Sequence, residues 1–149
     1  MAVLIRAIEL GDVGDAVRVA MASMTSPQFE DPENVAAYWA AVERTRGAGG
    51  EVFVAVSDGE VVGLCQVMIL AHFQRTGGWC GEVETVHVRA DQRGRGVGAA
   101  LLVAAEALAR ERGCYRIQLT SNLVRPDAHR FYERQGYVPS HQGFKKYLA

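Results

Sequence analysis

The sequence predicts an α/β protein of the α+β kind, with about four helices and a mixed, mostly antiparallel sheet of six to seven strands. Two observations carry this prediction. The pair Asp58-Gly59 separates two runs rich in β-branched residues, which is the strongest short-range signal for an antiparallel hairpin. Helical patterns follow strand patterns only in the second half of the chain, so a sheet that is parallel throughout is excluded. The predicted order of elements is β, α, α, β, β, β, α, β, α, β, β.

The first half of the chain contains a strand, two helices and the hairpin. Residues 3–8 form a short opening strand, and Asp12 can cap the helix that follows it. Ser26-Pro27 and Asp31-Pro32 interrupt the helical pattern, because a residue that precedes proline avoids the helical region. The hairpin strands are residues 51–56 and 61–70. The second helix has an apolar stripe made by Val35, Tyr38, Trp39 and Val42.

The second half contains the longest helix of the chain. Residues 97–112 place apolar side chains at helical spacing, and Gly113 is well placed to end this helix. Residues 71–81 include Gly77-Gly78 and are predicted to form a loop. The other predicted elements are strands at 82–88, 116–120, 137–138 and 144–148, and a short helix at 128–135 that Asp127 can cap.

Composition excludes several classes of protein. The chain has 149 residues, 49% of them hydrophobic, with 16 basic and 17 acidic side chains. This length suits a single domain that spans residues 1–149, and the hydrophobic content is too high for a disordered chain. Because there is no basic excess, we expect no nucleic-acid partner. No apolar run is long enough to span a membrane and no signal peptide is evident, so we expect a soluble, cytoplasmic protein. The three cysteines form no CxxC pair and no His, Asp and Glu cluster has ligand spacing, so we expect no metal.

The segment that points to chemistry lies between a strand and the longest helix. Gly94, Gly96 and Gly98 occupy alternate positions there, and Arg93 and Arg95 flank the first two glycines. The first amides of a helix have no partner within the helix, and the helix dipole adds positive potential around them. Glycine lets such amides converge and lets a ligand approach the backbone. The segment therefore predicts a site for a phosphate or pyrophosphate group.

Two other phosphate motifs fit this segment less well. The dinucleotide fingerprint G-x-G-x-x-G has a different spacing, and the P-loop requires a lysine that is absent here. A purely structural interpretation, in which the glycines only allow close packing of the helix, stays open at this point.

Two motifs together resemble the GNAT superfamily of N-acetyltransferases. Arg93-x-x-Gly96-x-Gly98 follows the strand 82–88 and is similar to the acyl-CoA-binding motif of that superfamily. About 35 residues later, Phe131-Tyr132 followed by Gly136-Tyr137 resembles its second motif. The resemblance implies the GNAT fold and acetyl-CoA as co-substrate. It implies that the strand before the glycine loop exposes backbone to the pantetheine arm and that loop amides hold the pyrophosphate. The implied cofactor-binding residues are Val86, His87, Val88, Arg93, Gly94, Arg95, Gly96, Val97, Gly98, Ala99, Asn122, His129 and Tyr132.

The resemblance also implies two proton-handling side chains. Tyr132 matches the usual acid that protonates the departing thiolate, and a phenol can donate a proton while remaining neutral at pH 7. Glu84 matches a common glutamate base that acts through a bound water. Strand alternation would place Glu84 on the same face as Val86, and Glu82 shares that face one step further out. His87 would point to the other face unless a bulge redirects it. Each of these side chains also has an ordinary structural interpretation, as a core tyrosine or a solvated carboxylate.

The acceptor implied by this reaction is a primary amine, carried by a small molecule or a peptide. Its pocket would be formed by the first two helices, the loop 71–81 and the C-terminal hairpin, with candidate lining residues Tyr38, Trp39, Phe73, Trp79, Phe144, Glu30, Asp31 and Glu33. The alternative is a non-catalytic acyl-CoA-binding sensor, which would need the glycine loop but neither Tyr132 nor Glu84. The C-terminal strands could pair across a two-fold axis, which would make the protein a homodimer.

Overall fold

Five strands form one sheet in which consecutive strands are also neighbours in space, in the order β1-β2-β3-β4-β5. The structure is a computed structural model and describes residues 2–149. The pairs from β1 to β4 are antiparallel, whereas β4 and β5 are parallel, so the mixed sheet predicted from the sequence is confirmed. The strands are β1 (Leu4–Ala7), β2 (Glu51–Ser57), β3 (Glu60–Ala71), β4 (Trp79–Val88) and β5 (Cys114–Leu119).

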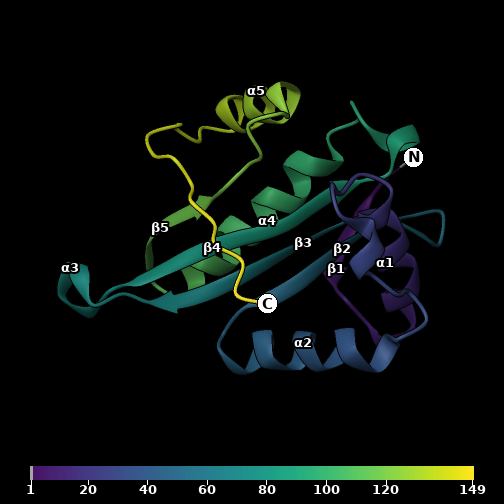
Figure 1. Cartoon of the computed structure of the whole chain (residues 1–149), viewed down its shortest axis with the longest axis horizontal. Coiled ribbons are helices and arrows are strands. Elements are labelled where there is room, and N and C mark those ends of the chain that lie inside the picture. The colour runs from purple at the N-terminus through teal and green to yellow at the C-terminus, as the bar shows by residue number, and fades with distance from the viewer. Residues whose placement is uncertain (1) are drawn as a thin grey trace.

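Helices cover both faces of this sheet (Figure 1). We name the face under α1 and α2 the first face and the face under α4 the second face. Phe131 and Tyr132 of α5 pack against the same apolar cluster as α4, so α5 also belongs to the second face. The α-helices are α1 (Val13–Met21), α2 (Val35–Gly47), α3 (Gln74–Gly77), α4 (Val97–Glu111) and α5 (Pro126–Arg134). Within the described residues, no helix is long and apolar enough to cross a membrane.

The central strands are apolar on both sides because both faces are covered. Val54 and Ala55 of β2 are adjacent and point to opposite faces, yet both are fully buried. Leu101 and Leu102 of α4 are also fully buried, against the second face. Burying side chains of this size contributes about 1.5–3 kcal/mol each, so these two layers of contacts account for much of the stability of the sheet.

The predicted hairpin is confirmed in its details. Asp58 and Gly59 have φ angles of 51° and 78°, and Ser57 pairs with Glu60. Positive φ at both central residues is the geometry that matches the twist of the flanking strands, and glycine adopts it without steric cost.

The predicted number of strands is wrong, because the described chain has five and not six to seven. Residues 137–138 and 144–148 have strand-forming sequences, but their backbones make no ladder with any strand. A strand exists only when a neighbour satisfies its amides and carbonyls, and alternation along the sequence does not reveal whether a neighbour is present.

The predicted loop 71–81 is also corrected. β3 continues to Ala71 and β4 begins at Trp79, and these two residues pair directly. Between them lies α3, a fifth helix that was not predicted, in which Arg75 and Thr76 have φ angles of 56° and 57°. The turn at Gly77-Gly78 was therefore recognised, but the strands extend further on both sides of it than the sequence indicated.

Candidate functional site

A cleft opens where β4 and β5 separate. The two strands pair from Trp79 and Cys114 as far as Val83 and Leu119, and beyond that point β4 continues without a partner on this side. Two strands that diverge in this way leave backbone amides and carbonyls of β4 free to bind a ligand. The resulting cleft has a volume of about 100 Å³ and is lined by Val83, Glu84, Thr85, Val86, His87, Leu119, Thr120, Ser121, Asn122, Arg125 and Tyr132.

The cleft brings together five of the residues proposed from the sequence, which are Glu84, Val86, His87, Asn122 and Tyr132. It does not include the others. Glu82 lies one step further along β4, Val88 lies toward the glycine loop, and His129 lies on α5. The glycine loop itself, residues 93–99, joins β4 to α4 outside the cleft lining.

A β-bulge at Thr85 changes the faces that were predicted for β4. Glu84 pairs with Gln66 and His87 pairs with Leu64, so a single residue of β3 faces two residues of β4. Thr85 has a φ of 55°, which is unusual for a β-branched residue.

The prediction that Glu84 and Val86 share a face is therefore wrong. Cross-strand partners lie on the same face, and Leu64, the partner of His87, belongs to the core under α1 and α2. Val86 instead packs into the core under α4. The extra residue reverses the alternation, so Glu84 and His87 face the first side while Val86 faces the second.

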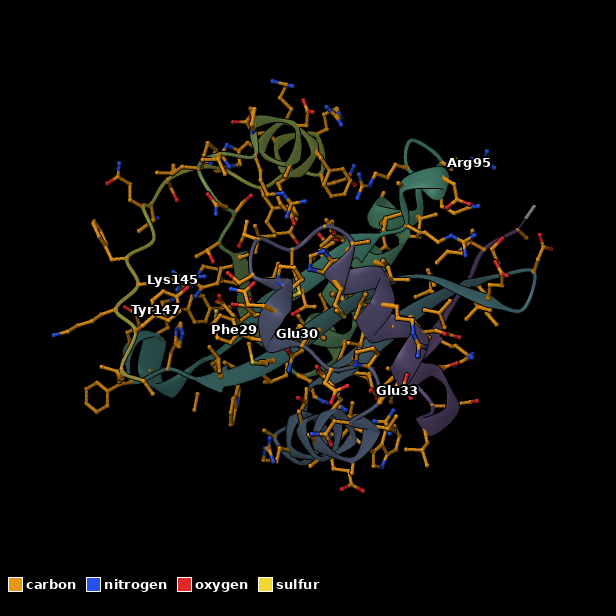
Figure 2. The ribbon with its side chains drawn as sticks, turned by 45° about the vertical axis from the view of Figure 1, so that its right-hand side comes forward. Phe29, Glu30, Glu33, Arg95, Lys145 and Tyr147 are labelled. Atoms are coloured by element: carbon orange, nitrogen blue, oxygen red, sulfur yellow. The ribbon has the colours of Figure 1, made fainter. Side chains whose placement is uncertain are left out.

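The glycine loop has the backbone geometry that a phosphate cradle requires. Gly94 and Gly96 have φ angles of 74° and 81°, and Gly96 is the residue immediately before α4. A Cβ atom at either glycine would meet no other atom within 4 Å, so their need for glycine comes from the backbone and not from neighbouring side chains. The Arg93 Nε donates to the Val88 carbonyl at 3.1 Å, and Arg95 extends away from the chain at the loop (Figure 2).

At Gly98, packing against a neighbouring side chain and not backbone conformation requires glycine. A Cβ atom there would lie 3.1 Å from Cζ of Phe131, so its absence allows α4 and α5 to approach closely. The structural interpretation of the glycine motif is thus correct for Gly98 and insufficient for Gly94 and Gly96. The loop lies at the start of a 15-residue helix, whose first amides have no intrahelical acceptor. These features fit a diphosphate group.

Tyr132 reaches the cleft from α5 on the second face. Its ring lies 5.2 Å from that of Phe131 and 6.1 Å from that of Tyr137, measured between centroids. Burial raises the pKa of the Tyr132 phenol above its ordinary value of 10, although the charge of Arg125 opposes this rise. The phenol is therefore protonated at pH 7, which is the state that can donate a proton.

Glu84 and Glu82 are two carboxylates on the first face of β4. Burial raises the pKa of Glu84 above its ordinary value, the charge of Glu82 raises it further, and Lys145 lowers it. One carboxylate oxygen of Glu82, Oε2, is buried and has no hydrogen-bond partner among the described residues. A raised pKa brings a carboxylate closer to the range in which it can accept a proton productively.

The sequence matches the profile of the acetyltransferase (GNAT) family over residues 18–137, which is most of the chain. The chain belongs to the GNAT family. The resemblance seen in the glycine loop and the Phe131-Tyr132 motif is thereby confirmed, and acetyl-CoA is the co-substrate that this family uses.

Individual relatives of this GNAT chain agree with that membership. It is 40% identical over 95 residues to the aminoalkylphosphonate N-acetyltransferase of Salmonella typhimurium, covering 64% of this chain and 61% of that protein. It is 33% identical over 96 residues to the glucosamine 6-phosphate N-acetyltransferase of Trypanosoma brucei brucei, covering 64% and 63%. The chain therefore spans just over three fifths of the length of these two relatives. A transcriptional regulator from Bacillus halodurans C-125 has the same fold, with a TM-score of 0.89, 33% identity, and coverage of 99% of this chain and 100% of that one.

A second cavity of the GNAT chain lies on the first face. It has a volume of about 180 Å³ and a mostly apolar lining contributed by α1, α2 and the sheet. Its polar lining residues are Glu30, Tyr38, Gln66 and Thr85, and Tyr38 donates a hydrogen bond to Glu30 at 2.7 Å. Thr85 lines both cavities, so the bulge residue stands between them.

The predicted acceptor residues are only partly gathered at this second cavity. Tyr38 and Glu30 line it, as expected from the sequence. Trp39, Asp31 and Glu33 do not line it, although they lie on or near α2. Phe73, Trp79 and Phe144 also lie elsewhere, and the Phe73 side chain is fully exposed. The two helices therefore contribute to a pocket as predicted, while the segment 71–81 does not.

His87 is held by a contact that no sequence pattern indicates. Its Nδ1 lies 2.6 Å from the hydroxyl oxygen of Ser23, which follows α1. His87 is buried, and this burial together with the charges of Arg125 and Arg93 lowers its pKa from 6.5 to about 4. The imidazole is therefore neutral at pH 7, and the bulge rather than ideal alternation sets its direction.

This neutral histidine should make stability depend on pH. Between pH 6.5 and about 4 the unfolded chain binds a proton at His87 that the folded chain does not, so stability is lost as pH falls through that window. With the pKa lowered from 6.5 to about 4, the full effect is about 3 kcal/mol at 1.36 kcal/mol per pKa unit. Urea unfolding of His87→Gln across these pH values should show a shallower loss than the wild type. His141→Gln, at an exposed histidine, should keep the wild-type slope; equal slopes in all three proteins would contradict the assignment.

Asn122 and His129 have local structural roles. The side-chain oxygen of Asn122 accepts a hydrogen bond from the Val124 amide at 3.1 Å, which is the turn-capping role considered for it. The Asn122 carbonyl oxygen lies 2.7 Å from Nε2 of His129. The contact with His129 therefore stabilises the turn that leads into α5. Binding of pantetheine by either residue stays a prediction.

Thr85, Ser23 and Arg125 are among the residues of the site that were not predicted from the sequence. Thr85 forms the bulge, Ser23 contacts His87, and Arg125 lines the cleft just before α5. No sequence pattern marks a bulge or a contact between residues 64 positions apart. Arg125 carried a weak signal, because it lies shortly before the helix predicted at 128–135, but a single arginine among many basic residues had no weight by itself.

Proposed function

We propose that this chain transfers the acetyl group of acetyl-CoA to the nitrogen of a small primary amine. The observation that carries the proposal is the cleft between β4 and β5, which has Glu84 and Tyr132 in its lining. The glycine loop follows β4 in the sequence and leads into α4. The membership in the GNAT family and the two N-acetyltransferases among its relatives support it.

The glycine loop would hold the diphosphate of acetyl-CoA, and the unpaired part of β4 would receive its pantetheine arm. Support comes from the open space at Gly94 and Gly96 and from the first amides of α4. A free backbone amide of β4 near Val86 would donate to the thioester oxygen, where negative charge develops during the reaction.

Glu84 and Tyr132 would handle the two protons of the reaction. Glu84, acting through a bound water, accepts the proton that the ammonium group must lose before its nitrogen attacks the carbonyl carbon. When the carbon–sulfur bond breaks, Tyr132 gives its phenolic proton to the sulfur, and the second proton that the nitrogen loses as the amide forms returns to the Tyr132 oxygen. The raised pKa of Glu84 suits a base, and the Tyr132 phenol carries at pH 7 the proton that it would donate. Glu82 is the second candidate for the base, since it lies on the same face.

The second cavity is proposed as the acceptor site because Thr85 joins it to the cleft. Its Glu30 carboxylate suits an ammonium group. Arg125, in the lining of the cleft, suits an acceptor that also carries an anionic group. The names of the two curated relatives describe acceptors of this second type, an aminoalkylphosphonate and a sugar phosphate.

A panel of amines tests the proposal. Release of free thiol from acetyl-CoA is measured with an aminoalkylphosphonate, glucosamine 6-phosphate, a polyamine and short peptides as acceptors. We expect turnover with at least one amine, and we expect Glu84→Gln to lower it with acetyl-CoA affinity retained. Acetyl-CoA binding without turnover on any acceptor would instead support the non-catalytic acyl-CoA sensor.

A further inference from the structure

The second cavity, under α1 and α2, is larger than the cleft that contains the candidate base and acid. Its volume is about 180 Å³, against about 100 Å³ for the cleft. Small side chains line it, because Ala16 and Ala20 lie one helical turn apart on α1 and Ala41 lies on α2. They leave the space between the helices and the sheet unfilled. Protein interiors contain few voids larger than a water molecule, so a space of this size indicates a ligand.

The walls of this cavity fit a hydrocarbon group. Val13, Val17, Val42 and Leu64 line it, and all four are buried. An apolar cavity of about 150 Å³ with walls of this kind stays dry and binds benzene. The second cavity is therefore large enough for a hydrocarbon group about the size of a phenyl ring, and burial of such a group from water is favourable.

The charges around the cavity suit a cation and not an anion. Among the described residues that line it, Glu30 alone is charged, and it lies in the segment that joins α1 to α2 (Figure 2). The Tyr38 hydroxyl donates to this carboxylate at 2.7 Å and accepts from the Asp31 amide at 2.9 Å, so the carboxylate is held in place. Arg125, which suits an anionic group, lines the cleft and not this cavity.

Gln66 connects the cavity with the candidate base. It lines the cavity and pairs with Glu84 across the strands β3 and β4, so the two side chains are neighbours on one face. The Thr45 hydroxyl donates to the Ala41 carbonyl at 2.8 Å and accepts from Nε2 of Gln66 at 3.0 Å. No described residue donates a hydrogen bond to Oε1 of Gln66. This oxygen can therefore accept a hydrogen bond from an amine beside Glu84.

We propose that the cavity binds the acceptor, and that the acceptor is a primary amine with a compact hydrocarbon body. The inference rests on the proposed function and specifies the acceptor class. The hydrocarbon body fills the space under α1 and α2, and Glu30 favours the positive charge. Oε1 of Gln66 accepts a hydrogen bond from the ammonium group and directs its nitrogen toward Glu84. Thr85 lines both cavities, so the nitrogen and the thioester meet beside it.

Binding to the wild-type chain tests the cavity separately from acetyl transfer. Calorimetric titrations use benzylamine, methylamine, benzene and glucosamine 6-phosphate, in the presence of CoA, which has no acetyl group to transfer. Benzylamine should bind at least about 100-fold more tightly than methylamine, because each buried group of the size of CH₂ contributes about fourfold. Benzene should bind more weakly than benzylamine, because it lacks the ammonium group.

Two outcomes of these titrations would overturn the proposal. One is equal affinity for benzylamine and methylamine, and the other is tighter binding of glucosamine 6-phosphate than of benzylamine. Release of thiol from acetyl-CoA with benzylamine is then measured separately. Benzylamine that binds as expected but is not acetylated would support the site and contradict the proposed function, so the two failures are distinguishable.

A variant that fills the cavity locates the ligand. Ala20→Leu places a larger side chain at a buried lining position, whereas Ala22→Leu makes the same change at the exposed residue that follows α1. Ala20→Leu should weaken benzylamine binding by at least about tenfold, since one methylene group in an apolar pocket is worth about that much. Ala22→Leu should bind benzylamine like the wild type. Thermal unfolding verifies that both variants fold, because filling a cavity commonly stabilises a protein.

A second variant tests the role of Gln66. Gln66→Met removes Oε1 and keeps a side chain of similar length. It should weaken benzylamine binding by about tenfold, the effect of one hydrogen bond to a charged group, and leave benzene binding unchanged. A merely structural role would weaken both ligands alike. An equal loss for both ligands in Gln66→Met, or an equal loss of benzylamine binding in Ala20→Leu and Ala22→Leu, would overturn the proposal.

Discussion

Replacing Tyr132 with phenylalanine should lower turnover by one to three orders of magnitude while acetyl-CoA affinity is nearly unchanged. The substitution removes the one hydroxyl that the phenol contributes to the cleft lining and keeps the ring that packs against Phe131 and Tyr137. Without an acid the sulfur must leave as an unprotonated thiolate, and a missing general acid typically costs 10²–10⁴-fold. The predicted range corresponds to roughly 1.4–4 kcal/mol of barrier. Steady-state kinetics and calorimetric titration with acetyl-CoA measure the two quantities.

Tyr137→Phe is the matched control for this variant. Tyr137 belongs to the same aromatic group, but its hydroxyl is buried, has no partner among the described residues and does not line the cleft. Removing an unsatisfied hydroxyl is neutral or stabilising, so the control should keep wild-type turnover and lose no stability. If Tyr132→Phe turned over at the wild-type rate, Tyr132 would have no part in proton transfer.

The glycine loop was predictable because its requirements are local. Positive φ at Gly94 and Gly96 and the start of a helix directly after them involve residues that adjoin in sequence. The hairpin at Asp58-Gly59 was predictable for the same reason. The family resemblance added Tyr132 and Glu84, which lie in two separate elements and meet only at the cleft. Local conformational preference thus indicated the glycine loop, and the family resemblance indicated Glu84 and Tyr132 of the cleft.

The bulge at Thr85 could not be predicted from the spacing of residues along the sequence. Alternation predicts faces correctly only while one residue opposes one residue, and the register between β3 and β4 shifts at this point. As a result, Glu84 and Val86, which were predicted to share a face, lie on opposite faces of the sheet. His87 lies on the same face as Glu84. Likewise, the strand-forming sequence of residues 144–148 contains no information about whether a neighbouring strand is present. Both failures concern pairing, which depends on a distant segment.

Replacing Gly96 with valine should abolish measurable acetyl-CoA binding while the chain still folds. Gly96 has a φ of 81°, and a left-handed conformation costs an L-residue about 1–2 kcal/mol, more for one that is β-branched. The loop would relieve this strain by turning its amides away from the point where they converge. The new side chain would also occupy the open space beside the loop, where we expect the diphosphate. We expect the dissociation constant to rise at least about 100-fold, since each 1.4 kcal/mol gives a tenfold change.

The control for Gly96→Val is Gly59→Val, which separates backbone strain from loss of the site. Gly59 has a φ of 78° and, like Gly96, has no atom within 4 Å of the position that a Cβ would take, but it lies in the hairpin between β2 and β3. Both variants should lose a similar amount of stability in urea unfolding, within the roughly 5–15 kcal/mol that a folded domain usually has. Only Gly96→Val should lose acetyl-CoA binding. If both variants bound acetyl-CoA equally well, the positive φ at Gly96 would serve the turn alone, and the diphosphate would have to be held by other parts of the chain.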